Sequence, residues 1–475
     1  MPQSGRPRLH GEEPRGIDLP SKNRNAEGRF GVMFKDLPPF QPADELLQAL
    51  AETMHEPGPP PPPELQNPSI PSGFTFFGQF VDHDITLDTT PLAEVAQDPD
   101  GVTNFRTPRY DLDSVYGRGP AEDPELYDPS DGDKLGLTGL GDPTQPDDLL
   151  RHADGTAKIG DPRNEENLII CQLQVAMIKF HNAVVDHVRA QPSPPQSVFE
   201  EARRLTMWHY QWVVVHDFLP RTIGAQMLGE ILQERPNQPA KVRLRFYKPK
   251  NPNRPMMPVE FAVAAYRFGH SQIRGGYRVN ATVGAAFFGE QPSDSNLNGF
   301  RPIPPSLGLE WHRFFDIPGA PGPPDNLTRK IDARLSEPLF NLPAPIVPPP
   351  DSRRSLALRN LLRGKIRGLP SGQAVAREMG LTALSNQQLG ISDHPGWSGE
   401  APLWFYVLKE AELQQNGERL GDVGGRIVGE VLVGLLEKDS RSYLRRDPGF
   451  RPRPPFAAAP GQFAIGDLLC FAGAA

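Results

Sequence analysis

Apolar residues recur at helical spacing in four stretches of the chain, whereas strand-like alternation is scarce. The longest stretch, 167–188, puts its apolar side chains on one face of a helix: Leu168, Cys171, Val175, Ile178, Val185 and Val188. Further helices are expected over about 199–219, 261–268 and 426–436, and the best strand signal covers 242–247. The pattern predicts a mainly α fold with little β structure.

Proline and glycine, 56 and 45 residues, gather between the periodic stretches. This distribution predicts helices joined by long, stiff, irregular loops. Residues 57–63 are almost all proline and should form extended polyproline II, and further breaks fall at 343–350 and 451–460. We expect a proline-rich, partly extended N-terminal arm (1–70), one large domain (71–440) and a proline-rich tail (441–475) packed on it.

The charge and the cysteines narrow the class of protein. A net charge of -8 argues against a nucleic-acid partner, which normally meets a basic surface. We see no apolar run near the ~20 residues that span a bilayer, and the first residues lack the apolar centre of a signal peptide, so a cytoplasmic location is expected. Cys171 and Cys470 make no disulfide framework and are expected to be core thiols.

The first candidate site lies in residues 78–84, directly after an apolar run of aromatic residues. If the segment is helical, Gln79 and His83 share a face at i and i+4, and Asp82 and Asp84 point to its flanks. Burying an imidazole beside two carboxylates is costly unless each group has a partner. The segment therefore indicates a cofactor, a metal or reactive chemistry.

A second candidate is the acidic segment 107–113. Thr107, Asp111 and Asp113 offer side-chain oxygens, and Arg109 offers its carbonyl. Calcium takes six to eight oxygen ligands, so one carboxylate from outside the segment, for which Asp84 is the natural choice, would extend the set. An ordinary acidic turn on the surface explains the same residues equally well.

Two further segments carry weaker signals. Asp161 is a candidate helix N-cap followed by proline, and Arg163 and Glu166 then share a face, most often as a solvated ion pair. His270 ends an apolar helix and follows Gly269, which leaves room for a flat group beside the imidazole. A histidine on an apolar helix is more commonly a core residue.

Together and in this order, the motifs resemble those of the animal-type haem peroxidases of the peroxidase-cyclooxygenase superfamily. The resemblance runs from about 74 to 436 and includes GQFVDHD, TPRYDLDSVYG, GDPRNEEN, EFAVAAYRFGH and RGLPSG. It implies a single large helical, cyclooxygenase-like domain that binds haem b. It also implies that hydrogen peroxide oxidises small donors, such as phenols, iodide, bromide or thiocyanate, through a ferryl intermediate.

The resemblance also assigns roles. It makes His270 the proximal iron ligand, His83 the distal base, Arg163 the stabiliser of the departing oxygen and Gln79 the holder of a water or small anion. Calcium would bind Asp84, Thr107, the Arg109 carbonyl, Asp111 and Asp113, with the Arg109 side chain in solvent. Asp82 and Glu166 occupy the positions that form haem esters in mammalian members, and Arg267 is expected to pair with a haem propionate. Gln373 is expected to replace the asparagine that hydrogen-bonds the proximal histidine.

Two alternatives remain open. Fatty-acid dioxygenases of the superfamily carry a tyrosine three residues before the proximal histidine, where this chain has Arg267. Tyr266 lies one residue further back, which on a helix rotates it by about 100°. The other alternative is a non-enzymatic, calcium-dependent binding or adhesion module, which would be colourless. The sequence determines neither the electron donor nor the oligomeric state.

Overall fold

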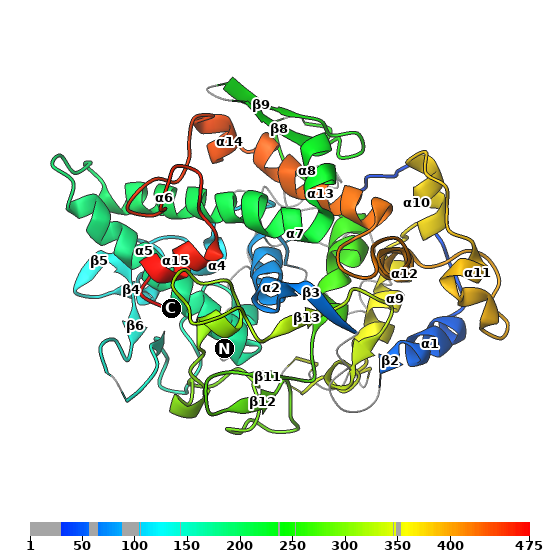
Figure 1. Ribbon diagram of the computed structural model, residues 1–475, viewed down its shortest axis with the longest axis horizontal. Helices are drawn as coiled ribbons and strands as arrows, with labels where there is room; N and C mark the ends of the chain where they lie inside the picture. Colours follow the sequence, from blue (N-terminus) through cyan, green and yellow to red (C-terminus); the bar gives the residue numbers. More distant parts are fainter. Residues whose placement is uncertain are drawn as a thin grey trace, which may run out of the picture.

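The computed structural model describes residues 30–56, 65–87, 104, 106–142, 144–235, 238–251, 253–344, 346–347 and 353–475. The polyproline stretch predicted at 57–63 lies outside these residues. Helix accounts for 44% of the structure and strand for 12%, which confirms the mainly α prediction (Figure 1).

Helix α2 (Gly73–Ile85) lies near the centre of the molecule and packs against the long helix α5 (Leu168–Arg189), while α6 (Val198–Val213) and α13 (Asp422–Lys438) lie above it in the view of Figure 1. The apolar face of α2 is aromatic: Phe77 and Phe80 each meet the ring of Tyr210 on α6 edge-on, with ring centroids 5.9 Å apart. Such edge-to-face pairs add to the burial of the rings themselves. The central helix is therefore held by a tightly packed aromatic core.

Helix α5 follows the predicted range closely. The side chain of Asn167 caps it by accepting hydrogen bonds from the amides of Ile169 and Ile170, which satisfies two of its first free N–H groups. Among the described residues, α5 is long and apolar enough to cross a membrane, but 83% of its most apolar window is buried inside the protein. The helix therefore satisfies the length and composition of a span while packing as a core helix.

The other predicted helices differ in regularity. The range 199–219 becomes α6, a π-helical turn at Val214–Phe218 and α7 (Leu219–Ile223), and 426–436 lies within α13. The range 261–268 is not α-helical. It is a π-helical turn (Glu260–Ala264) followed by a 3-10 helix (Ala265–Gln272), because Ala264 takes φ -130° and ψ -78° and interrupts the regular turn.

The remaining described α-helices are shorter than α5, α6 and α13 and lie mostly toward the edges of the molecule. Helices α9 to α12 gather on one side of it, near α1 (Figure 1). Their bounds are α1 (Asp44–Thr53), α4 (Asp113–Tyr116), α8 (Ala225–Ile231), α9 (Leu356–Ile366), α10 (Gly372–Glu378), α11 (Asn386–Leu389), α12 (Leu403–Gln415), α14 (Tyr443–Arg446) and α15 (Ile465–Phe471).

Strands in the described residues are short and form two-stranded pairs. The strand predicted at 242–247 is wrong, because β9 ends at Val242 and the amides of Phe246 and Tyr247 instead donate to the buried carboxylate of Glu430 at 2.7 and 3.0 Å. The pairs are β1 (Phe30–Gly31) with β10 (Met257–Pro258), β2 (His55–Glu56) with β14 (Leu335–Ser336), β3 (Gln66–Pro71) with β13 (Leu327–Arg329), β4 (Tyr127–Asp128) with β5 (Asp131–Leu135), β6 (Leu137–Thr138) with β7 (Asp148–Leu149), β8 (Leu232–Arg235) with β9 (Gln238–Val242) and β11 (Gly276–Arg278) with β12 (Gly284–Ala286).

Both end segments, where described, pack on the helical body. On the N-terminal side, α1 packs against α9, and β1, β2 and β3 pair with strands from beyond residue 250. On the C-terminal side, α15 packs against α5, and the Ile465 amide donates to Asp217 Oδ2 at 3.0 Å. Cys171 is buried as expected, but Cys470 is exposed on α15, so the prediction of a second core thiol is wrong.

Candidate active site

Helix α2 brings His83 into the interior of the protein. The His83 side chain is 5% exposed. Its Nδ1 atom lies 2.7 Å from Asn164 Oδ1, and Asn164 Nδ2 in turn donates to Gln174 Oε1 at 2.9 Å. An amide oxygen can only accept, so His83 Nδ1 carries the proton and Nε2 keeps its lone pair. Burial, reinforced by the nearby Arg163 guanidinium, lowers the pKa of His83 to about 3, so the imidazole is neutral at ordinary pH.

Arg163 anchors the end of α2. Its Nη2 atom donates to the carbonyl oxygens of His83 and Thr86 at 3.1 and 2.6 Å. The same guanidinium forms an ion pair with Asp161, whose carboxylate also accepts from the Arg163 amide. Asp161 caps only the 3-10 turn Pro162–Glu165. This turn does not continue into α5, which has Asn167 as its own N-cap. Arg163 is thereby fixed at both its backbone and its side chain.

Three polar side chains gather beside His83 and keep some accessible surface: Gln79, Asp82 and Glu166. Gln79 Nε2 donates to Glu166 Oε2 at 3.2 Å, and Asn167 Nδ2 donates to Gln79 Oε1 at 3.4 Å. Burial raises the pKa of Asp82, and it raises that of Glu166 to about 7. These carboxyl groups are therefore largely desolvated while they keep some accessible surface.

His270 lies on the 3-10 helix that faces α2. Its Nδ1 atom accepts from Asn360 Nδ2 on α9 at 2.8 Å, and Arg267 Nη1 donates to Asn360 Oδ1 at 3.0 Å. Burial, with Arg267 adding to it, lowers the pKa of His270 to about 3. His270 is therefore a neutral imidazole, the form that binds metals.

The expectation that Gln373 contacts His270 is wrong. Gln373 Nε2 donates to Asn386 Oδ1 at 2.8 Å, and its Oε1 accepts from the Ala401 amide at 2.9 Å. Both ends of this amide are thus engaged in holding the segment around α10. Asn360 on α9 supplies the contact to the imidazole instead.

The acidic segment 107–113 is buried, so the interpretation as a surface turn is wrong. Asp84, Asp111 and Asp113 are 0%, 7% and 4% exposed, and each offers an oxygen within 4.8 Å of the others. Both carboxylate oxygens of Asp84 and one of Asp111 are buried without a hydrogen bond among the described residues. Burial and the neighbouring carboxylates raise the pKa of Asp84 well above its usual range. Three buried carboxylates this close together are costly to ionise without a cation, and their oxygens are near enough to share one. We name Asp84, Asp111 and Asp113 the acidic cluster.

The other two predicted cation ligands lie at the edge of the cluster. Thr107 Oγ1 donates to Asp111 Oδ2 at 2.9 Å. The Arg109 side chain does not extend into solvent as expected. It forms an ion pair with Asp439 at 2.9 Å, just past the end of α13, because this carboxylate lies beside the segment.

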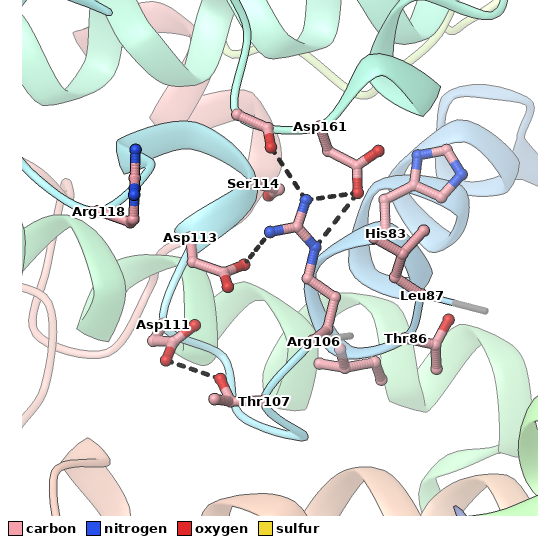
Figure 2. Close-up of polar contacts among 12 residues, drawn as sticks. His83, Thr86, Leu87, Arg106, Thr107, Asp111, Asp113, Ser114, Arg118 and Asp161 are labelled. Carbon is pink, nitrogen blue, oxygen red and sulfur yellow. Dashed lines mark hydrogen bonds and ion pairs between the residues drawn. The ribbon is translucent and has the colours of Figure 1, made fainter. Parts of the chain in front are cut away.

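Arg106 connects the acidic cluster to the segment that carries Arg163 (Figure 2). Its side chain is 0% exposed. Nη1 donates to Asp113 Oδ1 at 2.9 Å, while Nε and Nη2 donate to Asp161 Oδ2 at 3.2 and 2.6 Å, and Nη2 also reaches the Gly160 carbonyl at 3.0 Å. Burial alone would raise the pKa of Asp161. The guanidinium groups of Arg163 and Arg106 on either side of its carboxylate outweigh this effect and keep the pKa well below its usual range.

Comparison with known proteins identifies the family. A family model described as animal haem peroxidase matches residues 91–389. This range contains Arg163, His270 and Asn360 and makes up more than half of the chain. The chain belongs to the animal haem peroxidase family.

Individual relatives agree with this family membership. A peroxidase-like protein of Margaritifera margaritifera is 25% identical over 417 residues, which cover 81% of this chain and 50% of the relative. The chain thus spans about half the length of that protein. In fold, it is similar to peroxidase A of Dictyostelium discoideum (TM-score 0.64, 16% identity, 93% of this chain and 94% of that chain) and to the fatty acid alpha-dioxygenase of Arabidopsis thaliana (0.58, 16%, 87% and 74%).

The site suits the haem that an animal haem peroxidase binds. The two segments that carry His83 and His270 pack against each other, and the Tyr266 hydroxyl donates to the Gly78 carbonyl of α2 at 3.2 Å. We call these two segments the walls of the site. A Cβ atom added to Gly269 would meet only Thr75 Cγ2, at 3.9 Å, which leaves room beside His270. A neutral imidazole backed by an amide is a suitable axial ligand.

Sequence reasoning missed three residues of this site. Asn360 lies on the buried side of α9 with Ala357 and Leu361, and an amide on an apolar helix face is a usable signal. Asn164 follows the candidate Arg163 directly, but only the fold shows that it faces His83. Arg106 precedes the acidic segment, and an arginine beside several aspartates is more often a surface ion pair.

Proposed function

We propose that this chain is a haem peroxidase that uses hydrogen peroxide to oxidise small donors. The contact between His83 Nδ1 and Asn164 Oδ1 supports this function most directly, because it leaves Nε2 as a base inside the site. A core histidine whose two ring nitrogens were both hydrogen-bonded would offer no such base.

The residues of the chain would divide the work as follows. Haem, when bound, supplies the iron that binds peroxide and accepts the oxidising equivalents. His270 would hold the iron through Nε2, which requires its proton on Nδ1. The Asn360 amide would then turn its oxygen toward the ring, in place of the Nδ2 atom that faces His270 in the structure, and would give up the bond from Arg267 Nη1. His83 Nε2 would take the proton from the inner peroxide oxygen and return it to the outer one.

Arg163 and Gln79 would assist this proton transfer. Arg163 Nη1 makes no hydrogen bond among the described residues and is the nitrogen that can stabilise negative charge on the departing oxygen. Gln79 would hold a water or small anion, since its amide already lies between Glu166 and Asn167. Arg267, next to Asn360, would pair with a haem propionate.

We propose calcium as the cation of the acidic cluster. Asp84, Asp111 and Asp113 supply carboxylate oxygens, Thr107 its hydroxyl and Arg109 its carbonyl, and hard oxygen ligands favour calcium. Because Asp84 directly follows His83, the ion would fix the end of α2. Removing calcium with a chelator should lower the melting temperature of the wild type, and Asp84→Asn should weaken calcium binding measured by isothermal titration.

Two features refine the chemistry. Asp82 and Glu166 are proposed as ester links to haem, and acid-acetone extraction should leave haem on the protein if either ester forms.

Asn167 occupies the position of the methionine that forms a sulfonium link in one mammalian member, and here it caps α5. Without that electron-withdrawing bond we expect oxidation of phenols, iodide, bromide or thiocyanate rather than chloride.

Fatty-acid dioxygenation is the second candidate, supported by the structural similarity to two fatty acid alpha-dioxygenases. Its residue would be Tyr266, whose hydroxyl donates to the Gly78 carbonyl of α2 at 3.2 Å. On the observed 3-10 helix, with three residues per turn, Arg267 rather than Tyr266 lies directly over His270. This placement favours the peroxidase.

One pair of assays tests the proposal. Peroxide-dependent oxidation of guaiacol and iodide is measured beside oxygen uptake with linoleate, using the haem-loaded protein. We expect guaiacol or iodide turnover and no oxygen uptake. Oxygen uptake that disappears in Tyr266→Phe would favour the dioxygenase. A haem-free protein whose stability depends on calcium would favour the binding or adhesion module.

A further inference from the structure

Four buried carboxylates meet two guanidinium groups between the acidic cluster and α2. The carboxylates are Asp84, Asp111, Asp113 and Asp161, and the guanidinium groups are Arg106 and Arg163. With all four carboxyl groups ionised, as cation binding would require, this count leaves two negative charges in the interior. Arg441 reaches Asp111 at 3.4 Å, but its side chain is 54% exposed, so water screens its charge. A divalent cation would balance the group.

The ion pairs form a continuous series. Asp113 contacts Arg106, and Arg106 binds Asp161 through two nitrogens. Asp161 Oδ1 accepts from both the amide and Nε of Arg163, at 2.9 and 3.1 Å. Arg163 then donates to the carbonyls of His83 and Thr86. The series joins the acidic cluster to the end of α2 by side chains alone.

This series is separate from the direct route along the backbone from Asp84 to His83. The two routes differ in what they require. The backbone route needs only that Asp84 binds the cation. The side-chain route needs one guanidinium whose separate nitrogens reach two carboxylates at once, and Arg106 has this geometry.

We propose that Arg106 is a positioning residue that transmits cation binding at the acidic cluster to Asp161 and Arg163. The inference rests on the proposed function, since it takes a divalent cation as the occupant of the cluster. With the cation in place, Asp113 is shared between the ion and Arg106, and Arg106 is held against Asp161. Without the cation, three carboxylates compete for Arg106, the one fully buried guanidinium beside them in the described residues, and draw it from Asp161.

Hydrogen exchange read by mass spectrometry tests this transmission. The Arg163 amide donates to Asp161 Oδ1, so its exchange reports the position of that carboxylate, and residues 161–167 contain no cation ligand. In the full-length, haem-loaded wild type, calcium instead of chelator should slow exchange in 161–167 by about tenfold, a usual size for coupling between sites. Unchanged exchange there would overturn the proposal without any variant.

The Arg106→Lys variant keeps the positive charge but loses the planar guanidinium, whose separate nitrogens contact Asp113 and Asp161 at once. In this variant, calcium should still protect residues 109–113, but the effect in 161–167 should fall below about threefold. Arg118→Lys is the matched control, since Arg118 pairs with Asp123 outside the series, and it should behave as the wild type. A full calcium effect in 161–167 of Arg106→Lys would overturn the proposal.

Failure of the proposed function gives a different result. A protein that binds calcium but no haem would contradict the peroxidase, while the exchange measurement would still decide the role of Arg106. Absence of calcium binding by isothermal titration would contradict both calcium as the occupant of the acidic cluster and the role of Arg106, whereas the peroxidase would still be judged by haem binding and donor oxidation.

Discussion

His83 Nδ1 and Asn164 Oδ1 lie 2.7 Å apart, and this contact decides which nitrogen of the imidazole carries the proton. Asn164 is itself oriented by Gln174, whose side chain accepts from its amide nitrogen at 2.9 Å. A base inside an active site must be both neutral and correctly protonated. The pair Asn164–Gln174 meets the second requirement, and burial meets the first.

Replacing Asn164 tests this contact. Asn164→Leu removes the acceptor, so His83 can carry its proton on either nitrogen, and the reaction with hydrogen peroxide should slow by about tenfold or more. Asn164→Asp keeps an acceptor for His83 Nδ1, but its carboxylate stabilises the imidazolium and leaves Gln174 Oε1 without its donor, so its rate should fall as the pH is lowered at values where the wild-type rate stays level. Stopped-flow absorbance measures both rates. Equal rates for Asn164→Leu and the wild type would show that the contact has no role in the reaction.

His83→Ala should separate binding from reaction. The haem should stay bound, because His270 lies on the other wall of the site, while the rate with peroxide falls by about 10²–10⁴, the usual contribution of a general base. His187→Ala, on the outer part of α5, is the control and should react normally. A fully active His83→Ala variant would disprove the assignment of the base.

The sequence predicted well those features that depend on neighbouring residues. The spacing of Gln79 and His83 on one helix, the range of α5 and the juxtaposition of Asp84 with 107–113 follow from local periodicity or from chemistry that needs a partner. Contacts between distant segments were harder to predict. Asn360 and Gln373 are amides 13 residues apart in the sequence, and only the packing of α9 shows which one reaches His270.

Regular geometry was also assumed where the chain departs from it. The segment 261–268 has an apolar pattern typical of an α-helix, yet its backbone changes from a π-helical turn to a 3-10 helix at Ala264. The segment 242–247 has the composition of a strand, but Glu430 captures two of its amides. In the second case a tertiary contact overrides the local preference.

The contact between Asn360 and His270 can be tested with two substitutions. Asn360→Leu should change the absorption spectrum of the ferric protein and weaken haem retention, because His270 loses the group that orients its ring. Gln373→Leu is the control: it should affect only the packing around α10 and leave the spectrum unchanged. The reverse pattern would restore Gln373 as the partner of His270.

A buried histidine away from the site gives a pH prediction. His181 Nδ1 lies 3.0 Å from the Tyr116 hydroxyl, and its Nε2 lies 2.9 Å from the Asp133 carbonyl. Burial, to which Arg203 and Lys134 add, lowers its pKa to about 4, although the Asp133 carbonyl opposes the shift. Below about pH 6.5, His181 binds a proton in the unfolded chain, whereas in the folded protein it stays neutral down to about pH 4. The free energy of unfolding therefore falls as the pH drops from about 6.5 toward 4.

This loss should amount to about 2 kcal/mol at pH 5. His181→Gln removes the titrating group, so the destabilisation it causes should be about 2 kcal/mol smaller at pH 5.0 than at pH 7.5. Urea unfolding of wild type and variant at the two pH values measures the difference. An identical destabilisation at both values would contradict the neutral state of His181.

The proposed peroxidase function depends most on haem that is held by His270 between the two walls of the site. The absorption spectrum of the full-length protein, produced with ample haem supply, tests this most directly. We predict a Soret band in the wild type that is lost in His270→Ala, with circular dichroism showing that the variant keeps its helices. A folded wild-type protein without a Soret band, or a His270→Ala variant that retains the band unchanged, would contradict the account.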